Sequence, residues 1–144
     1  MTRPTAFPPL VTLLILGCGA TDPGANSQPS AHDESPPGIQ SISAGMATAF
    51  GPMSIPAGGG SITYQISDQT QTLTSDHFDV AVLLGSYVQS WTGPGTAPAF
   101  AEKQEAVNAS ATTPLLQAGD YYAVVRCTNI VDNCILSIAL TATY

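Results

Sequence analysis

The stretch DYYAVVRCTNIVDNCILSIALTAT (residues 120–143) contains two alternating runs of apolar and polar or small residues, separated by a short loop between two cysteines. Alternation with a period of two is typical of β-strands that bury one face. We expect Asp120–Cys127 and Cys134–Thr143 to form an antiparallel hairpin, with Cys127 opposite Cys134. A slip of one residue would mix the apolar and polar sides. In this register the apolar side holds the pairs Val125/Leu136, Ala123/Ile138 and Tyr121/Leu140.

The same register predicts a disulfide between Cys127 and Cys134. Directly opposed residues of an antiparallel pair lie within the Cα separation that a disulfide spans. Closing the loop between these cysteines stabilises the fold by roughly 2.5 kcal/mol on a chain-entropy argument. The alternative is two buried free thiols, which a thiol count under denaturing, non-reducing conditions would reveal.

Similar short runs, separated by Gly, Pro, Asn and Asp, extend upstream to about residue 44. Met46–Ile55 is interrupted by Gly51-Pro52, which indicates an edge strand or a bulge. Phe78–Leu84 is apolar on both faces and is therefore predicted to be central. We expect residues 44–144 to form one all-β domain, a jelly-roll-like antiparallel β-sandwich. In the run 61–67, the residues predicted to face the core are Ile62, Tyr64 and Ile66.

The first residues resemble a bacterial export signal. Residues 1–17 place Arg3 before a short apolar run and then small residues, which is the order of a signal peptide. Ile15-Leu16-Gly17-Cys18 resembles the lipobox of bacterial lipoproteins. That resemblance implies cleavage before Cys18, acylation of its thiol and stable membrane anchoring by several acyl chains. The alternative is ordinary cleavage after Ala20, which would discard Cys18.

Residues 18–43 are rich in Gly, Pro, Ser, Asn and Asp and show no apolar periodicity, so we expect a disordered tether. The tripeptide His32-Asp33-Glu34 is interpreted as part of this solvated linker and not as a metal site. Cys18 is followed by Gly19 and not by Asp. By resemblance to lipoprotein sorting in enteric bacteria, this favours the outer membrane.

The charge balance excludes one class of partner. The chain has 10 Asp and Glu against 3 Lys and Arg, a formal net charge of −7. Such a surface repels nucleic acid and anionic lipid headgroups. We therefore expect no nucleic-acid partner, and membrane contact only through an acylated Cys18.

Three further features resemble those of known β-sandwich families. The strand at 78–83, the turn with Tyr87 and Trp91, and the run LQAGDYYAVVR (116–126) are similar to the GOLD-like domains. The glycine turn into a Tyr-rich strand also resembles bacterial pre-peptidase C-terminal domains. Either resemblance implies a compact accessory module for protein or ligand contact, without catalytic residues.

Catalytic and metal-binding patterns are weak. The sequence lacks G-x-S-x-G, and His32 falls in the expected tether, which leaves His77 as the sole candidate base. Asp76, His77 and Asp79 form a cluster without a distant fourth ligand, so a solvated loop is the favoured interpretation. We predict no catalytic residue, no metal and no cofactor.

One aromatic pair is a candidate binding feature. Ser86–Trp91 is predicted to form a helical turn that Ser86 caps, with Tyr87 and Trp91 on one side. The two rings are a possible stacking platform for a sugar or for an apolar side chain of a partner. The alternative is that they cap the open end of the sandwich core.

These observations predict a lipid-anchored, non-catalytic module of the cell envelope that binds an envelope protein or a glycan. Two alternatives are a small secreted hydrolase that uses His77 and a purely structural envelope lipoprotein. A His77 on an open loop would argue against the hydrolase.

Overall fold

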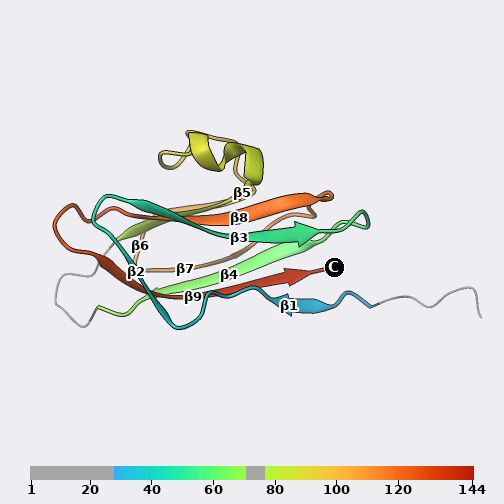
Figure 1. The fold of residues 1–144 in the computed structure, drawn as a ribbon, viewed down its shortest axis with the longest axis horizontal. Coiled ribbons are helices and arrows are strands. Elements are labelled where there is room, and N and C mark those ends of the chain that lie inside the picture. The colour runs from blue at the N-terminus through green and yellow to red at the C-terminus, as the bar shows by residue number, and fades with distance from the viewer. Residues whose placement is uncertain (1–27, 71–76) are drawn as a thin grey trace, which may run out of the picture.

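The computed structural model describes residues 28–70 and 77–144, and it contains two antiparallel sheets packed face to face (Figure 1). The predicted β-sandwich is therefore confirmed. The β9 sheet has the order β1/β2, β9, β4, β7, in which β1 and β2 both pair with the same side of β9. Its strands are β1 (Ala31–Asp33), β2 (Ile39–Ile42), β4 (Ser61–Asp68), β7 (Asn108–Thr112) and β9 (Cys134–Thr143).

The β8 sheet has the order β3, β8, β5, β6. Its strands are β3 (Ala47–Ile55), β5 (Phe78–Leu84), β6 (Ala101–Ala106) and β8 (Gly119–Cys127). Among the described residues, six of the eight connections between consecutive strands cross from one sheet to the other, and the exceptions are β1 to β2 and β5 to β6. The connection from β5 to β6 stays with the β8 sheet and carries the short 3-10 helix η1 (Gly85–Ser90).

The strand interiors follow the alternation of the sequence. Ile62, Tyr64 and Ile66 are at most 3% exposed, as predicted. Strand β5 lies between β8 and β6, so its predicted central position is also confirmed. Strand β3 is an edge strand, and its register with β8 shifts between Phe50 and Met53, around the Gly51-Pro52 interruption.

The predicted hairpin of the two C-terminal strands is wrong. Strands β8 and β9 belong to different sheets and form an arch across the sandwich, with no backbone ladder between them. The predicted disulfide is present and joins Cys127 to Cys134, with a Cα–Cα distance of 5.5 Å. Alternation decides which side chains face the core, and it is satisfied equally by a hairpin and by an arch. The side chains predicted to be inward are therefore buried, but they meet across the core: Tyr121, Ala123, Val125, Leu136, Ile138 and Leu140.

The predicted disordered tether is wrong for its described part, residues 28–43. Strands β1 and β2 extend the β9 sheet, and the side chain of Ile42 is 1% exposed. The backbones of Ser30 and Tyr144 exchange two hydrogen bonds of 2.8 and 3.0 Å. His32 stacks on Tyr144 with ring centroids 4.3 Å apart, so it is part of the domain. The sandwich thus begins near residue 30 and not at residue 44. The segment predicted to be a signal peptide (1–17) and Cys18 lie outside the described residues.

In the part of the chain that the structure describes, no helix has the length and apolar character needed to cross a membrane.

Tyr64 places a polar hydroxyl group in the apolar core. Its side chain is 0% exposed, and its hydroxyl has no hydrogen-bond partner among the described residues. Burial raises the pKa of Tyr64 to about 12, and the negative charge of Glu102 acts in the same direction. An unsatisfied hydroxyl in a core costs stability because its hydrogen bonds to water are lost on folding.

Replacing Tyr64 with phenylalanine is expected to raise the free energy of unfolding by about 1 kcal/mol at neutral pH. Above the ordinary pKa of 10.0, the unfolded tyrosine ionises while the folded one stays neutral, so the wild type loses stability as the pH rises toward 12. That loss amounts to roughly 2–3 kcal/mol by pH 12 and is absent in Tyr64→Phe. Urea unfolding at pH 7 and pH 11 measures both effects. Tyr87→Phe, at a ring that is 38% exposed, is the control, and a Tyr64→Phe variant less stable than wild type at pH 7 contradicts the prediction.

Candidate functional site

The segment between β5 and β6 covers the outer face of the β8 sheet. Figure 1 shows η1 and the loop after it lying over this sheet, on the side away from the β9 sheet. The segment builds a second apolar cluster, separate from the core between the sheets. The buried members of this cluster are Ala81, Leu83, Trp91 and Val124, with Val88, Ala97 and Tyr122 packed against them.

Trp91 anchors the segment between β5 and β6 on the β8 sheet by packing and by a hydrogen bond. Its side chain is 4% exposed, and its Nε1 donates a hydrogen bond of 3.2 Å to Oε1 of Glu102 on β6. The backbone N–H of Gly95 donates to both oxygens of Glu102, at 3.2 and 3.1 Å. Arg126 on β8 donates a hydrogen bond of 2.8 Å to the carbonyl oxygen of Thr92. The loop that follows η1 is thus held at several points.

The predicted platform of Tyr87 and Trp91 is therefore not formed. Tyr87 is 38% exposed, but the Trp91 ring is buried on the outer face of the β8 sheet and offers no free stacking surface. It does not cap the open end of the main core either. The predicted helical turn exists as η1, but it starts at Gly85, and no side chain caps it, so the expected cap by Ser86 is wrong. The sequence pattern could not show that an inserted segment folds back over a sheet face.

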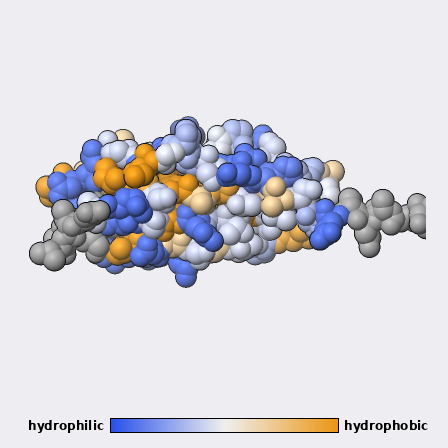
Figure 2. Space-filling model, turned by 90° about the horizontal axis from the view of Figure 1, so that it is seen from below, coloured by the Kyte–Doolittle hydropathy of each residue, from blue (hydrophilic) through white to orange (hydrophobic). Residues whose placement is uncertain are grey.

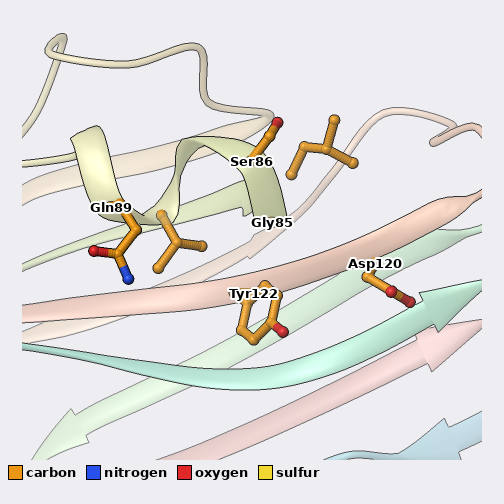
Figure 3. A pocket seen from close by; sticks show the side chains of 7 residues that line it. Gly85, Ser86, Gln89, Asp120 and Tyr122 are labelled. Atoms are coloured by element: carbon orange, nitrogen blue, oxygen red, sulfur yellow. The ribbon is translucent and has the colours of Figure 1, made fainter.

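A different site lies beside the predicted one, where η1 meets strand β8. An open groove of about 540 Å³ lies beside their contact, between part of the helix and the strand (Figure 3). Gln89 and Ser86 border it from η1, and Asp120 and Tyr122 border it from β8. The remaining lining residues are Leu84, Gly85 and Val88.

Two glycines make room for the partly buried Tyr122 ring. A Cβ atom at Gly51 on β3 would lie 3.1 Å from Cδ1 of the ring, and one at Gly85 would lie 3.1 Å from Cε2. These two carbons are on opposite edges of the ring, and β3 and β5 flank β8 on either side. The ring is therefore seated between the two glycines at the edge of the groove.

Asp120 supplies a carboxylate two residues before Tyr122, on the same side of β8. Its Oδ1 accepts a hydrogen bond of 2.6 Å from Oγ of Ser54 on the neighbouring strand β3. The side chain is exposed, so the carboxylate keeps contact with solvent while the serine orients it. A carboxylate accepts several hydrogen bonds, and the Gln89 amide both donates and accepts them.

The other sequence candidates have structural roles or lie outside the described residues. His77 is exposed at the start of β5, and its carbonyl oxygen accepts hydrogen bonds from N and Oγ1 of Thr128 at 3.0 and 2.7 Å. Asp79 is 4% exposed, and its Oδ1 accepts a hydrogen bond of 2.9 Å from the backbone N–H of Glu105. Asp76 is not among the described residues. Within residues 28–70 and 77–144, no group of three His, Cys, Asp or Glu side chains is placed to hold a metal ion.

Tyr122 was not among the predicted site residues, because the alternation of residues 120–127 indicates only which side chains face the core. In the alternating run 120–127, Tyr122 falls on the side of the strand opposite to Tyr121, Ala123 and Val125, which were predicted to face the core. That signal marked the ring as accessible. The groove above it depends on η1, whose position the sequence does not reveal.

Comparison with models of protein families and with curated proteins gave no match to this chain.

Proposed function

We propose that this protein is a lipid-anchored β-sandwich of the bacterial cell envelope that binds a carbohydrate, without catalysis, in the groove between η1 and β8. The observation that carries the proposal is the combination of Tyr122, Asp120 and Gln89 around one open groove. An aromatic ring packs against the C–H face of a sugar, while carboxylate and amide groups bind its hydroxyls. An open groove with polar groups suits a hydrophilic ligand better than an apolar one.

The anchoring part of the proposal is supported by the sequence. Ile15-Leu16-Gly17-Cys18 resembles a lipobox at the end of an apolar run. The disulfide uses the other two of the three cysteines, so Cys18 has no partner within the chain and is available for acylation. The resemblance of the strand and turn pattern to GOLD-like and pre-peptidase C-terminal domains also supports an accessory role.

The non-catalytic part is supported by the surroundings of His77. His77 is exposed, and it lines neither the groove beside η1 nor the two other surface pockets described for the structure. A general base needs a nucleophile or water within reach and an orienting partner in a shaped site. The groove that we assign to the ligand lies over the β8 sheet and not beside His77.

Replacing Tyr122 with alanine is expected to weaken carbohydrate binding roughly five- to tenfold, because packing of one aromatic ring is worth on the order of 1 kcal/mol. The measurement is calorimetric titration of the full-length protein in detergent with neutral oligosaccharides of glucose, galactose, mannose and N-acetylglucosamine. Tyr122→Phe keeps the ring and is expected to bind within about twofold of the wild type.

Tyr87→Ala is the matched control, since Tyr87 is an exposed tyrosine of η1 that does not line the groove. It is expected to leave the affinity unchanged. Thermal unfolding of each variant confirms that the fold is kept. If no oligosaccharide binds, or if Tyr87→Ala and Tyr122→Ala have equal effects, the groove is not a carbohydrate site.

The intact mass of the purified mature protein tests the anchor. We expect a chain that begins at Cys18 and carries acyl groups. A chain that begins at Thr21 and carries no lipid would contradict the lipoprotein assignment.

A further inference from the structure

The loop between β8 and β9, residues 128–133, exposes aliphatic side chains at one end of the sandwich. Ile130 is 85% exposed and Val131 is 79% exposed. Met46, in the neighbouring loop before β3, is 60% exposed. The two loops are joined, since the N–H of Gly45 donates a hydrogen bond of 2.8 Å to the carbonyl oxygen of Asn129. We call Met46, Ile130 and Val131 the tip.

The tip is held in a fixed conformation. The Cys127–Cys134 disulfide closes the base of the loop. Within the loop, Oδ1 of Asn129 accepts hydrogen bonds from the N–H groups of Val131 and Asp132 at 2.9 and 3.2 Å. The core gains nothing from aliphatic side chains that point into water. A rigid loop that presents them loses little conformational entropy on binding, which favours recognition.

The tip lies at the end of the sandwich opposite to the point where the preceding chain enters. Strand β9 starts at Cys134, next to the tip, and Ser30 pairs with Tyr144 just beyond the other end of this strand. Ten residues of strand separate the two ends by about 30 Å. Figure 1 shows the β8–β9 loop at the far left and the C-terminus on the right. On the face shown in Figure 2, hydrophobic residues likewise gather toward the left end.

We propose that the tip inserts into a concave, aliphatic-lined site on a different protein whose rim is basic. A symmetric contact with a second copy of this chain would bring the Asp132 carboxylates of the two loops together, so like charges argue against a dimer through the tip. Charge argues against an anionic lipid surface. The described residues include two basic side chains, Lys103 and Arg126, and eight acidic ones, since Asp22 and Asp76 of the ten lie outside. Asp132, within the loop itself, favours a basic rim.

The test starts with a photoreactive amino acid at position 130 of the full-length protein, in the cells that produce it. Leu115 is the matched control position, because it is 80% exposed and lies in a loop at the opposite end, next to the Gly60–Leu116 bridge. We expect one crosslinked protein at position 130 that is absent at position 115. The crosslinked protein is identified by mass spectrometry and purified, and its affinity for the full-length protein is measured.

Ile130→Asp is expected to weaken this binding about 100-fold, whereas Leu115→Asp changes it less than twofold. Added salt is expected to weaken the binding, because the basic rim faces an acidic protein. Four outcomes overturn the proposal: no crosslink specific to position 130, a partner whose affinity Ile130→Asp leaves unchanged, a crosslink to a second copy of this chain, or sedimentation with phosphatidylcholine vesicles that depends on Ile130. The inference does not depend on the groove or its ligand.

Discussion

Alanine at position 91 is expected to lower the free energy of unfolding by about 3–5 kcal/mol, the loss typical of a buried aromatic residue. Trp91 is 4% exposed and packs on Ala81, Leu83 and Val124, which form the outer face of the β8 sheet. The substitution also leaves the Glu102 carboxylate without the indole N–H that donates to it. Both losses act on the segment 85–100, so this segment is expected to detach from the sheet before the sandwich unfolds.

Chemical denaturation measures the loss of stability, and amide hydrogen exchange locates it. Faster exchange is expected at two backbone N–H groups. The N–H of Gly95 donates a hydrogen bond to the Glu102 carboxylate, and the N–H of residue 91 donates one to the carbonyl oxygen of Tyr87. Tyr87→Ala is the control and is expected to change stability by less than about 0.5 kcal/mol, since the Tyr87 ring is largely in solvent. A loss below 1 kcal/mol in Trp91→Ala would mean that the covering segment is held by its hydrogen bonds and not by the indole.

The position of Trp91 explains why strand β5 is apolar on both faces. Strand β5 is apolar on both faces, which indicates a strand covered on both sides. One side faces the main core, and the other side is covered by η1 and Trp91. Apolar pattern predicts that a face is covered, but a short 3-10 helix and a Gly- and Pro-rich loop have no periodicity that identifies them as the cover. The groove beside η1 was unpredictable for the same reason.

The edge of the β9 sheet was missed because β1 and β2 depend little on burial. Of residues 31–42, Ile42 is the one that enters the main core. The remainder is held by backbone hydrogen bonds to β9, by the exchange of hydrogen bonds between Ser35 and Leu140, and by the stacking of His32 on Tyr144. The composition of residues 31–42 therefore resembles that of a solvated linker, although their backbone adds two strands to the β9 sheet. Hydrophobic periodicity does not indicate a strand that is held mainly by backbone hydrogen bonds to a neighbouring strand.

A hairpin and an arch of strands β8 and β9 place the same side chains in the core. In a hairpin, neighbouring strands share backbone hydrogen bonds, and side chains on one face lie next to each other. In an arch, the same side chains face each other across the core. Both arrangements give Cys127 and Cys134 the same inward orientation, and both allow the Cα separation of 5.5 Å. The difference lies in what holds the two strands together once the disulfide is removed.

The double variant Cys127→Ala/Cys134→Ala is expected to lose about 2.5 kcal/mol of stability from the closed loop alone, and more from the lost sulfur packing, since both cysteines are 0% exposed. No backbone ladder joins β8 to β9, so the loss is expected to open the end of the sandwich at the tip. Amide exchange should increase at residues 127 and 69. The N–H of residue 127 donates a hydrogen bond to the carbonyl oxygen of Met46, and the N–H of Gln69 donates one to the carbonyl oxygen of Ile135. Exchange at Tyr144, at the opposite end, should stay unchanged.

Reduction of the wild-type protein is the matched measurement, because it breaks the same bond without changing the sequence. It is expected to lower the stability by a similar amount, whereas the double variant should not respond to the reductant. A hairpin would keep the ends of β8 and β9 together through hydrogen bonds, and exchange at residues 127 and 69 would then change little. An unchanged end, or a loss below 1 kcal/mol, would therefore contradict the arch and the role of the disulfide in holding this end of the two sheets together.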